Sequence, residues 1–173
     1  MNRSQRDVTI YNYKLVLRIR HRLIWLALYG LLPVGVFASV AIRYGLPLAL
    51  WTPAGFIGMM WLHGVVSWLD LRFSADRVSR TWRLVIRFPW LGLLPDQPVS
   101  LRVVRRLQST QLLIGTACIG VVYPWVAGVA VLQLLVTHVW ILLPTFWMLA
   151  RFRAASRHGL LKIGPKETSY YVE

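Results

Sequence analysis

Acidic residues and cysteine are both scarce in this chain. Only six Asp and Glu stand against 20 Lys and Arg, and no two of the acids have the spacing that metal binding or acid–base catalysis requires. The sequence also lacks the HExxH, CxxC, P-loop and GxSxG motifs. Its one cysteine, Cys118, cannot form an intramolecular disulfide. We therefore predict no metal, no cofactor and no catalytic residue.

Charge is missing almost completely from two long runs. Residues 107–150 contain no charged side chain, and residues 23–69 contain only Arg43. A helix needs ~20 apolar residues to cross a hydrocarbon core of ~30 Å, so each run is long enough for a helical hairpin that crosses a membrane and returns. We expect four spans, at residues 23–42, 47–69, 107–125 and 128–150. A hydrophobic content of 57% agrees with this interpretation.

Prolines and short turns interrupt the apolar runs. Pro33, Pro53 and Pro144 lie inside expected spans, which a membrane helix tolerates where neighbouring groups bond to the freed carbonyls. The turns within the hairpins are short, at residues 43–45 and 123–125. They leave no room for a binding domain on that side of the membrane.

The positive charge is concentrated in the three segments outside the hairpins. Basic residues outnumber acids by six to one in residues 1–22, by eight to three in residues 70–106, and by five to two in residues 151–173. Short basic segments stay in the cytoplasm, so we expect both termini there. The compact turns favour a bacterial inner membrane, and the excess of Arg over Lys, 17 to 3, suggests a GC-rich genome.

The segment 70–106 has a helical pattern of apolar and basic residues. From Ser74 onward, Val78, Trp82 and Val85 repeat on one face, which predicts an amphipathic helix lying on the inner leaflet. Trp82 and Trp90 would anchor it at the headgroups. The basic face available to anionic lipid or a partner comprises Arg77, Arg80, Arg83, Arg87, Arg102, Arg105 and Arg106.

Two further inferences concern this segment. Pro98 and Ser100 mark the start of a helix that continues into the third span. The simpler interpretation of these arginines is that they enforce topology alone, and the alternative is a specific lipid- or protein-binding role. Nucleic acid is not an expected partner, because the basic residues adjoin the spans and no recognition motif is present.

Polar residues inside the spans form the candidate site. His63, Ser67 and Asp70 are spaced i, i+4 and i+7, which places them on one face of the second span. His138 on the fourth span is their natural partner. The candidate intramembrane polar site is therefore His63, Ser67, Asp70, Gln133, Thr137 and His138. We interpret it as a polar stripe satisfied by neighbouring helices, with a proton or ligand site and, third, hydrolysis as alternatives.

The pattern as a whole predicts an all-α integral membrane protein. Its four transmembrane helices form two hairpins, at residues 23–69 and 107–150, with an interfacial amphipathic helix between them. The basic leads at 1–22 and 70–106 and the tail at 151–173 would face the cytoplasm.

The function we expect is that of a non-enzymatic subunit of a larger membrane assembly, docking anionic lipid, a membrane protein or a second copy of itself. The Tyr11–Lys14 lead into an apolar span is loosely similar to small TcpE-type membrane subunits of conjugation machines. The resemblance covers roughly the first 75 residues, and the positive-inside rule can generate the same pattern. Two alternatives remain. One is a small transporter or oligomeric channel using His63 and His138, and the other is a lipid-headgroup enzyme using Asp70 and His63.

Overall fold

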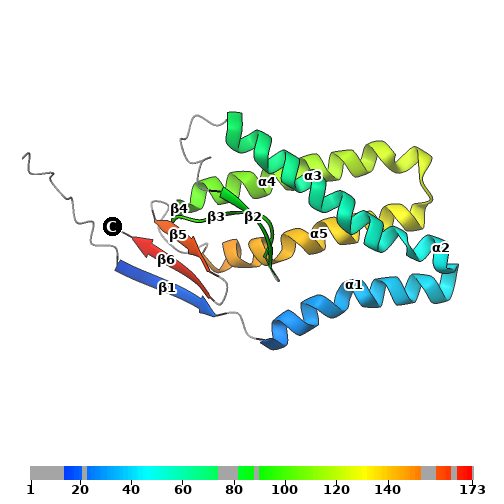
Figure 1. Ribbon diagram of the computed structural model, residues 1–173, viewed down its shortest axis with the longest axis horizontal. Coiled ribbons are helices and arrows are strands. Elements are labelled where there is room, and N and C mark those ends of the chain that lie inside the picture. The colour runs from blue at the N-terminus through cyan, green and yellow to red at the C-terminus, as the bar shows by residue number, and fades with distance from the viewer. Residues whose placement is uncertain are drawn as a thin grey trace, which may run out of the picture.

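The computed structural model describes residues 14–20, 23–73, 82–87, 90–152, 159–164 and 167–172. Long helices dominate this part of the chain (Figure 1). In chain order they are α1 (Leu23–Tyr44), the short α2 (Leu46–Ala49), α3 (Trp51–Phe73), α4 (Leu101–Val122), the 3-10 turn η2 (Tyr123–Trp125) and α5 (Gly128–Arg151). The helix boundaries lie close to those expected of the four apolar spans. Both short turns fall where the sequence predicts them.

Three helical segments are long and apolar enough to cross a membrane. They are Leu26–Tyr44, Leu46–Phe73 and Gly128–Arg151. The prediction of a multi-pass membrane protein is supported at this level. Helix α4 is not among the three, because Arg102, Arg105 and Arg106 occupy its first two turns. Its start is as predicted, since the Oγ of Ser100 accepts a hydrogen bond from the backbone N–H of Val103 at 3.4 Å.

The prediction of an all-α fold is confirmed only in part: the described chain is mostly helical, but a four-stranded antiparallel sheet closes one end of the helices. Its strand order is β1-β6-β5-β4, with β1 at Lys14–Arg20, β6 at Glu167–Val172, β5 at Leu160–Ile163 and β4 at Val99–Ser100. The sheet joins the segment before α1 to the segment after α5. These segments are basic, short and far apart in the sequence, so neither shows a strand until it is paired with the other.

The prediction of an amphipathic helix is wrong over the described part of this segment. Residues Trp82–Arg87 form strand β2, which pairs antiparallel with β3 at Trp90–Pro95, and residues 74–81 lie outside the described ranges. The sequence of β2 alternates in a period of two as well as fitting a helical period. Aromatic and β-branched residues favour the strand. Gly92, which pairs with Val85, has a φ of 120°, a backbone conformation that residues with a side chain rarely adopt.

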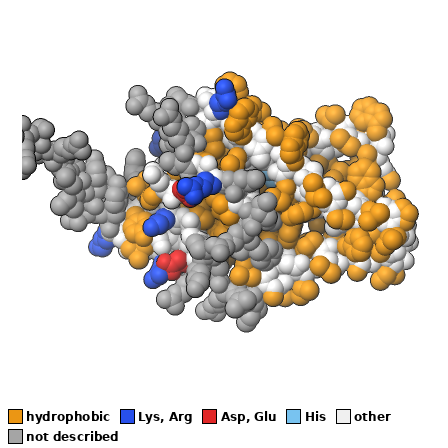
Figure 2. Space-filling model, in the orientation of Figure 1, with side chains coloured by type: hydrophobic (Ala, Val, Ile, Leu, Met, Phe, Trp, Pro, Cys, Tyr) orange, Lys and Arg blue, Asp and Glu red, His pale blue; other side chains and the backbone are white. Residues whose placement is uncertain are grey.

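Charged and apolar surface are separated along the molecule. Figure 2 shows Lys, Arg, Asp and Glu gathered over the β strands, while hydrophobic side chains cover the helices away from them. We call the first region the sheet end and the region around α2 and η2 the turn end. The described ends of the chain meet at the sheet end, where Lys14 pairs with Val172.

Helices α3, α4 and α5 pack against one another, whereas α1 lies largely outside this three-helix bundle. Only 6% of the apolar segment of α1 is buried, against 33% for Leu46–Phe73 and 39% for Gly128–Arg151. The bundle core contains Met59, Ile119, Trp140 and Ile141. A second core at the sheet end is built on Trp90, Val104, Met148, Phe152, Leu161 and Tyr170.

Two prolines explain how α1 is attached to α5. Pro33 and Pro144 lack the N–H that would bond to the carbonyls of Tyr29 and Trp140, four residues earlier. Each freed carbonyl accepts a hydrogen bond from the other residue's side chain. The Tyr29 hydroxyl donates to the Trp140 carbonyl, and the Trp140 indole N–H donates to the Tyr29 carbonyl, both at 2.8 Å. The two rings are stacked, with centroids 4.6 Å apart. This reciprocal contact, the Tyr29–Trp140 clamp, is the kind of compensation expected for prolines in membrane helices.

Candidate functional site

The two predicted intramembrane histidines meet inside the bundle. His63 on α3 and His138 on α5 lie with Nε2 of His63 2.8 Å from Nδ1 of His138. The two residues are 3% and 0% exposed. Gly115 on α4 makes room for them, because a Cβ at that position would collide with the His138 ring. The contact therefore requires all three bundle helices.

The hydrogen bonds around His138 determine which nitrogens carry protons when both rings are neutral. Nε2 of His138 lies 3.3 Å from the carbonyl of Leu112 and 3.5 Å from Oγ1 of Thr116. A carbonyl only accepts, so His138 Nε2–H is the donor and Nδ1 keeps a lone pair. Nε2–H of His63 then donates to that lone pair. Nδ1 of His63 is left as an acceptor, buried and without a hydrogen-bond partner among the described residues.

Ser67 extends the polar contacts from the histidines to α4. Its hydroxyl donates to the His63 carbonyl at 2.6 Å, one helical turn back along α3. The Gln111 side chain donates to the Ser67 hydroxyl at 2.6 Å. Ser67 is therefore bonded to a backbone carbonyl and an amide, and its hydroxyl is not bonded to a histidine ring. This arrangement gives no support to hydrolysis by a Ser-His-Asp triad.

The remaining predicted members of the site lie elsewhere. Asp70 is at the sheet end, 3.4 Å from the Arg106 guanidinium. Gln133 lies toward the turn end, where its side chain contacts Thr52 at 2.6 Å and donates to the Leu48 carbonyl at 3.1 Å. Thr137 is buried and lines an apolar groove between α1, α3 and α5. The structure thus assembles His63, Ser67 and His138, and separates the other three.

Sequence reasoning missed the contribution of α4. Gln108, Gln111 and Gly115 are spaced i, i+3 and i+7, which puts them on one helix face toward α3 and α5. Gln108 donates to the Leu142 carbonyl on α5 at 3.2 Å. The available signal was two glutamines on the same helix face as a glycine, within a run that has no charged residue.

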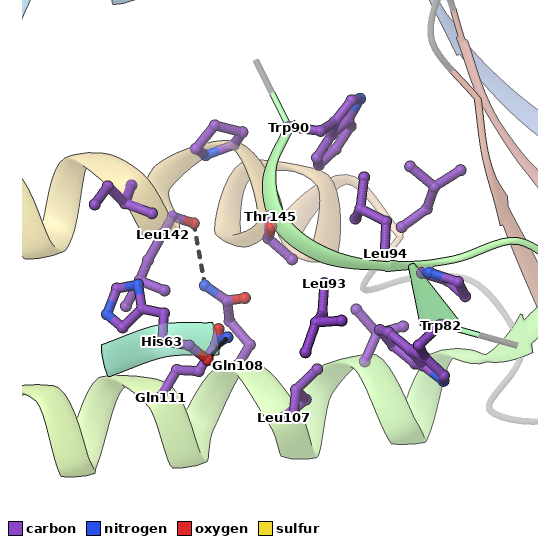
Figure 3. A pocket seen from close by; sticks show the side chains of 15 residues that line it. His63, Trp82, Trp90, Leu93, Leu94, Leu107, Gln108, Gln111, Leu142 and Thr145 are labelled. Carbon is purple, nitrogen blue, oxygen red and sulfur yellow. Dashed lines mark hydrogen bonds between the residues drawn. The ribbon is translucent and has the colours of Figure 1, made fainter. Parts of the chain in front are cut away.

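A small cavity separates this site from the sheet end. Figure 3 shows His63, Gln108 and Gln111 at one end and the side chains of the β2–β3 hairpin at the other. The cavity has a volume of about 40 Å³. Its hairpin wall includes Trp82, whose indole N–H is buried without a hydrogen-bond partner among the described residues. Polar and apolar groups contribute about equally to the surface of the cavity.

The predicted basic face is divided among different environments. Arg77 and Arg80 lie outside the described residues, as does the side chain of Arg87. Arg83 forms an exposed ion pair with Asp96 at 2.6 Å. Arg102 and Arg105 are exposed on the first turns of α4, and Arg106 contacts Asp70. The described arginines of this predicted face therefore lie on a strand and on the start of α4, and do not belong to one amphipathic helix.

The predicted interfacial anchors are not at the surface. Trp90 is 4% exposed and belongs to the core at the sheet end, and Trp82 packs partly buried against that core. Two exposed tryptophans lie instead beside arginine at helix ends. Arg72 lies over Trp68 on α3, and Arg151 lies over Trp147 on α5, with 5.1 and 5.4 Å to the ring centroids. Their i, i+4 spacing was visible in the sequence, and such pairs are typical of a membrane interface.

Comparisons with protein-family models, curated proteins and solved structures find no match for this chain. The fold and the site define its class by themselves. The chain is mostly helical, with apolar helices long enough for a multi-pass membrane protein, and a β sheet covers one end of a bundle that contains a histidine pair.

Proposed function

We propose that this chain is a non-enzymatic, four-span subunit of a larger assembly in a bacterial inner membrane, and that it docks a protein partner in the cytoplasm through strand β1. The observation that carries this proposal is the exposure of strand β1 and of helix α1. These two elements begin the described chain and contribute little to its own core.

The fourth span in this proposal is α4. Helix α4 packs along both α3 and α5, which are themselves long and apolar enough to cross a membrane. A helix in the middle of such a bundle enters the bilayer with its neighbours. The three arginines of α4 lie at its sheet end, where they can reach the headgroups. An even number of spans agrees with both termini on one side, and the basic sheet end favours the cytoplasmic side.

Strand β1 is suited to pairing with another chain. It pairs with β6 along one edge, and it is an outer strand of the sheet. Leu15, Val16 and Leu17 are 47%, 52% and 41% exposed. An exposed apolar edge strand is a template for strand addition, which proteins normally protect unless it is used. Charge also favours a partner that is acidic, because β1 carries Lys14 and Arg20 in addition to Arg18, which pairs with Glu167 of β6.

Helix α1 supports the same conclusion within the membrane. Leu28, Leu31 and Val34 are 55%, 61% and 60% exposed, so most of the helix faces away from its own bundle. Lipid or a helix of another subunit would cover this surface.

The test is affinity purification of the full chain from native membranes in mild detergent, followed by mass spectrometry. The double variant Val16→Lys, Leu17→Lys places charge on the exposed edge, whereas Val16→Thr keeps a β-branched residue there as a matched control. We expect a stoichiometric partner with the wild type and with Val16→Thr, and at least about a tenfold loss with the double variant, corresponding to ~1.4 kcal/mol. A monomer without a partner, or equal recovery from all three proteins, would overturn the proposal.

A small transporter or oligomeric channel is the second candidate, and the His63–His138 contact favours it. Replacing both histidines by Asn distinguishes the two functions. A transporter should lose flux in reconstituted vesicles, whereas a docking subunit should retain its partner.

A further inference from the structure

The histidine pair and the cavity beside it suggest a site that the docking function does not use. His63 is 3% exposed and lines the cavity, and its Nε2 is already engaged with His138. Nδ1 is the ring nitrogen that remains, and it has no hydrogen-bond partner among the described residues. A buried acceptor without a partner destabilises the folded protein, and a small ligand in the cavity would relieve that cost.

The size and lining of the cavity indicate the chemistry of that ligand. A buried water needs roughly 10–15 Å³ of such space and two or more polar partners, so a cavity of about 40 Å³ is large enough for a short file of waters and too small for an organic solute. His63 Nδ1 offers an acceptor. The amides of Gln108 and Gln111 supply further polar groups in the lining of the cavity.

We propose that this cavity is a hydrated proton-acceptor site, in which water hydrogen-bonds to His63 Nδ1 and brings the His63–His138 pair one proton from the sheet end. A hydronium ion in the cavity transfers a proton to Nδ1 and becomes water, and a new N–H bond forms on His63. The Nε2–H of His63 stays bonded to Nδ1 of His138, so the positive charge is stabilised by the neighbouring lone pair. No bond other than the O–H bond of hydronium breaks.

The pair takes up one proton and no more. A second proton would occupy the His138 lone pair and would place two cations in contact, which is strongly unfavourable in a buried site. Among the described residues that line the cavity, His63 is the one titratable group. The charged groups of α3 and α4 at the sheet end, Asp70 and Arg106, contact each other, and α5 contributes His138 itself.

Nitrogen-15 NMR of the histidine-labelled full chain in lipid nanodiscs tests the proposal. The chain has four histidines, so loss of a signal in His63→Gln or His138→Gln assigns the spectrum. At high pH we expect His63 Nδ1 to be unprotonated and to show a cross-peak to water. On acidification its resonance should shift to the protonated range, while His138 Nε2 stays protonated throughout.

A cavity-filling variant provides the second measurement. Leu93 lies in the middle of the cavity wall, on β3 (Figure 3). Leu93→Phe should remove the water cross-peak and slow the protonation of Nδ1, whereas Leu93→Met, which conserves volume, should leave both unchanged. If Leu93→Phe does not fold, the wild-type spectra alone test whether His63 Nδ1 contacts water and takes up a proton. The proposal is overturned if Nδ1 of His63 carries a proton at high pH, stays unprotonated throughout acidification, or shows no contact with water.

Discussion

Helices α1 and α5 have almost the same apolar character and very different surroundings. The mean hydropathy is 1.8 for Leu26–Tyr44 and 1.9 for Gly128–Arg151, yet 6% of the first and 39% of the second is buried. The difference lies in their polar residues. Helix α5 carries Gln133 and His138, which bond across to α2, α3 and α4, while Ser39 of α1 bonds to the Val36 carbonyl of its own helix.

The comparison shows what holds helices together when lipid surrounds them. Lipid tails are as apolar as leucine, so apolar surface gives a helix little preference for another helix over the bilayer. Close packing and interhelical hydrogen bonds provide that preference. The bundle of α3, α4 and α5 has both, whereas α1 is held by the Tyr29–Trp140 clamp and its covalent connection to α2.

Disturbing the histidine pair should cause the largest loss in the free energy of unfolding of the three-helix bundle. Gly115→Ala puts a Cβ into the His138 ring, so we expect a loss of about 1–3 kcal/mol in the free energy of unfolding, as for other overpacked cores. Gly120→Ala on the same helix is the control, because a Cβ there has no atom within 4 Å. Equilibrium unfolding in mixed micelles measures both. Equal effects of the two variants would contradict the packing of α4 against His138.

Removing the clamp should release α1 and leave the bundle intact. Tyr29→Phe removes one donor and leaves the proline-freed Trp140 carbonyl without it, for a loss of about 0.6–2 kcal/mol. Trp140→Phe removes the other donor and also packing in the bundle core, so its loss should be larger. A double-mutant cycle should show coupling, because the two bonds join the same residues. Spin-label distances between α1 and α5 should lengthen, while the His63 and His138 resonances stay unchanged. Ser39→Ala, which affects a bond within α1, is the control, and a shift of the histidine signals by Tyr29→Phe would argue against independent attachment.

Ion pairs at the sheet end should contribute least to the free energy of unfolding. Arg83 and Asp96 have side chains 76% and 47% exposed, so Arg83→Ala should change the free energy of unfolding by less than ~0.5 kcal/mol. Arg106→Ala should cost more, up to ~1 kcal/mol, because the Asp70 side chain is only 18% exposed. Unfolding at low and high salt measures both. A larger loss of stability in Arg83→Ala than in Arg106→Ala would mean that the β2–β3 hairpin depends on its ion pair more than on the packing of Trp82 and Trp90.

Much of the candidate site could be predicted from particular residues. His63 and Ser67 share a helix face by spacing, and His138 was the expected partner on the fourth apolar segment, which the 2.8 Å contact confirms. Asp70 continues the same spacing but lies where α3 meets Arg106, outside the apolar core. Gln133 is five residues from His138 toward the turn end, so it reaches Thr52 and Leu48 instead. Helical spacing thus gave the face of each residue but not its depth.

The strands could not be predicted in the same way. Trp82 and Val85 fit a helical face as well as a strand, and the choice is made by pairing with Trp90–Pro95. Strand β1 pairs with residues more than 140 positions away, between Lys14↔Val172 and Arg20↔Glu167. No local window contains both partners.

The sequence by itself determined the long apolar helices, the turns between them, and the residues able to form polar contacts inside them. These depend on the local composition of each segment, because transfer into a bilayer is decided by the hydrophobicity of ~20 consecutive residues. Only the tertiary structure decided the sheet, the reciprocal Tyr29–Trp140 bonds and the cavity next to His63. These depend on where segments far apart in the chain meet, since a strand, a freed carbonyl and a buried histidine are each satisfied by a partner on another element.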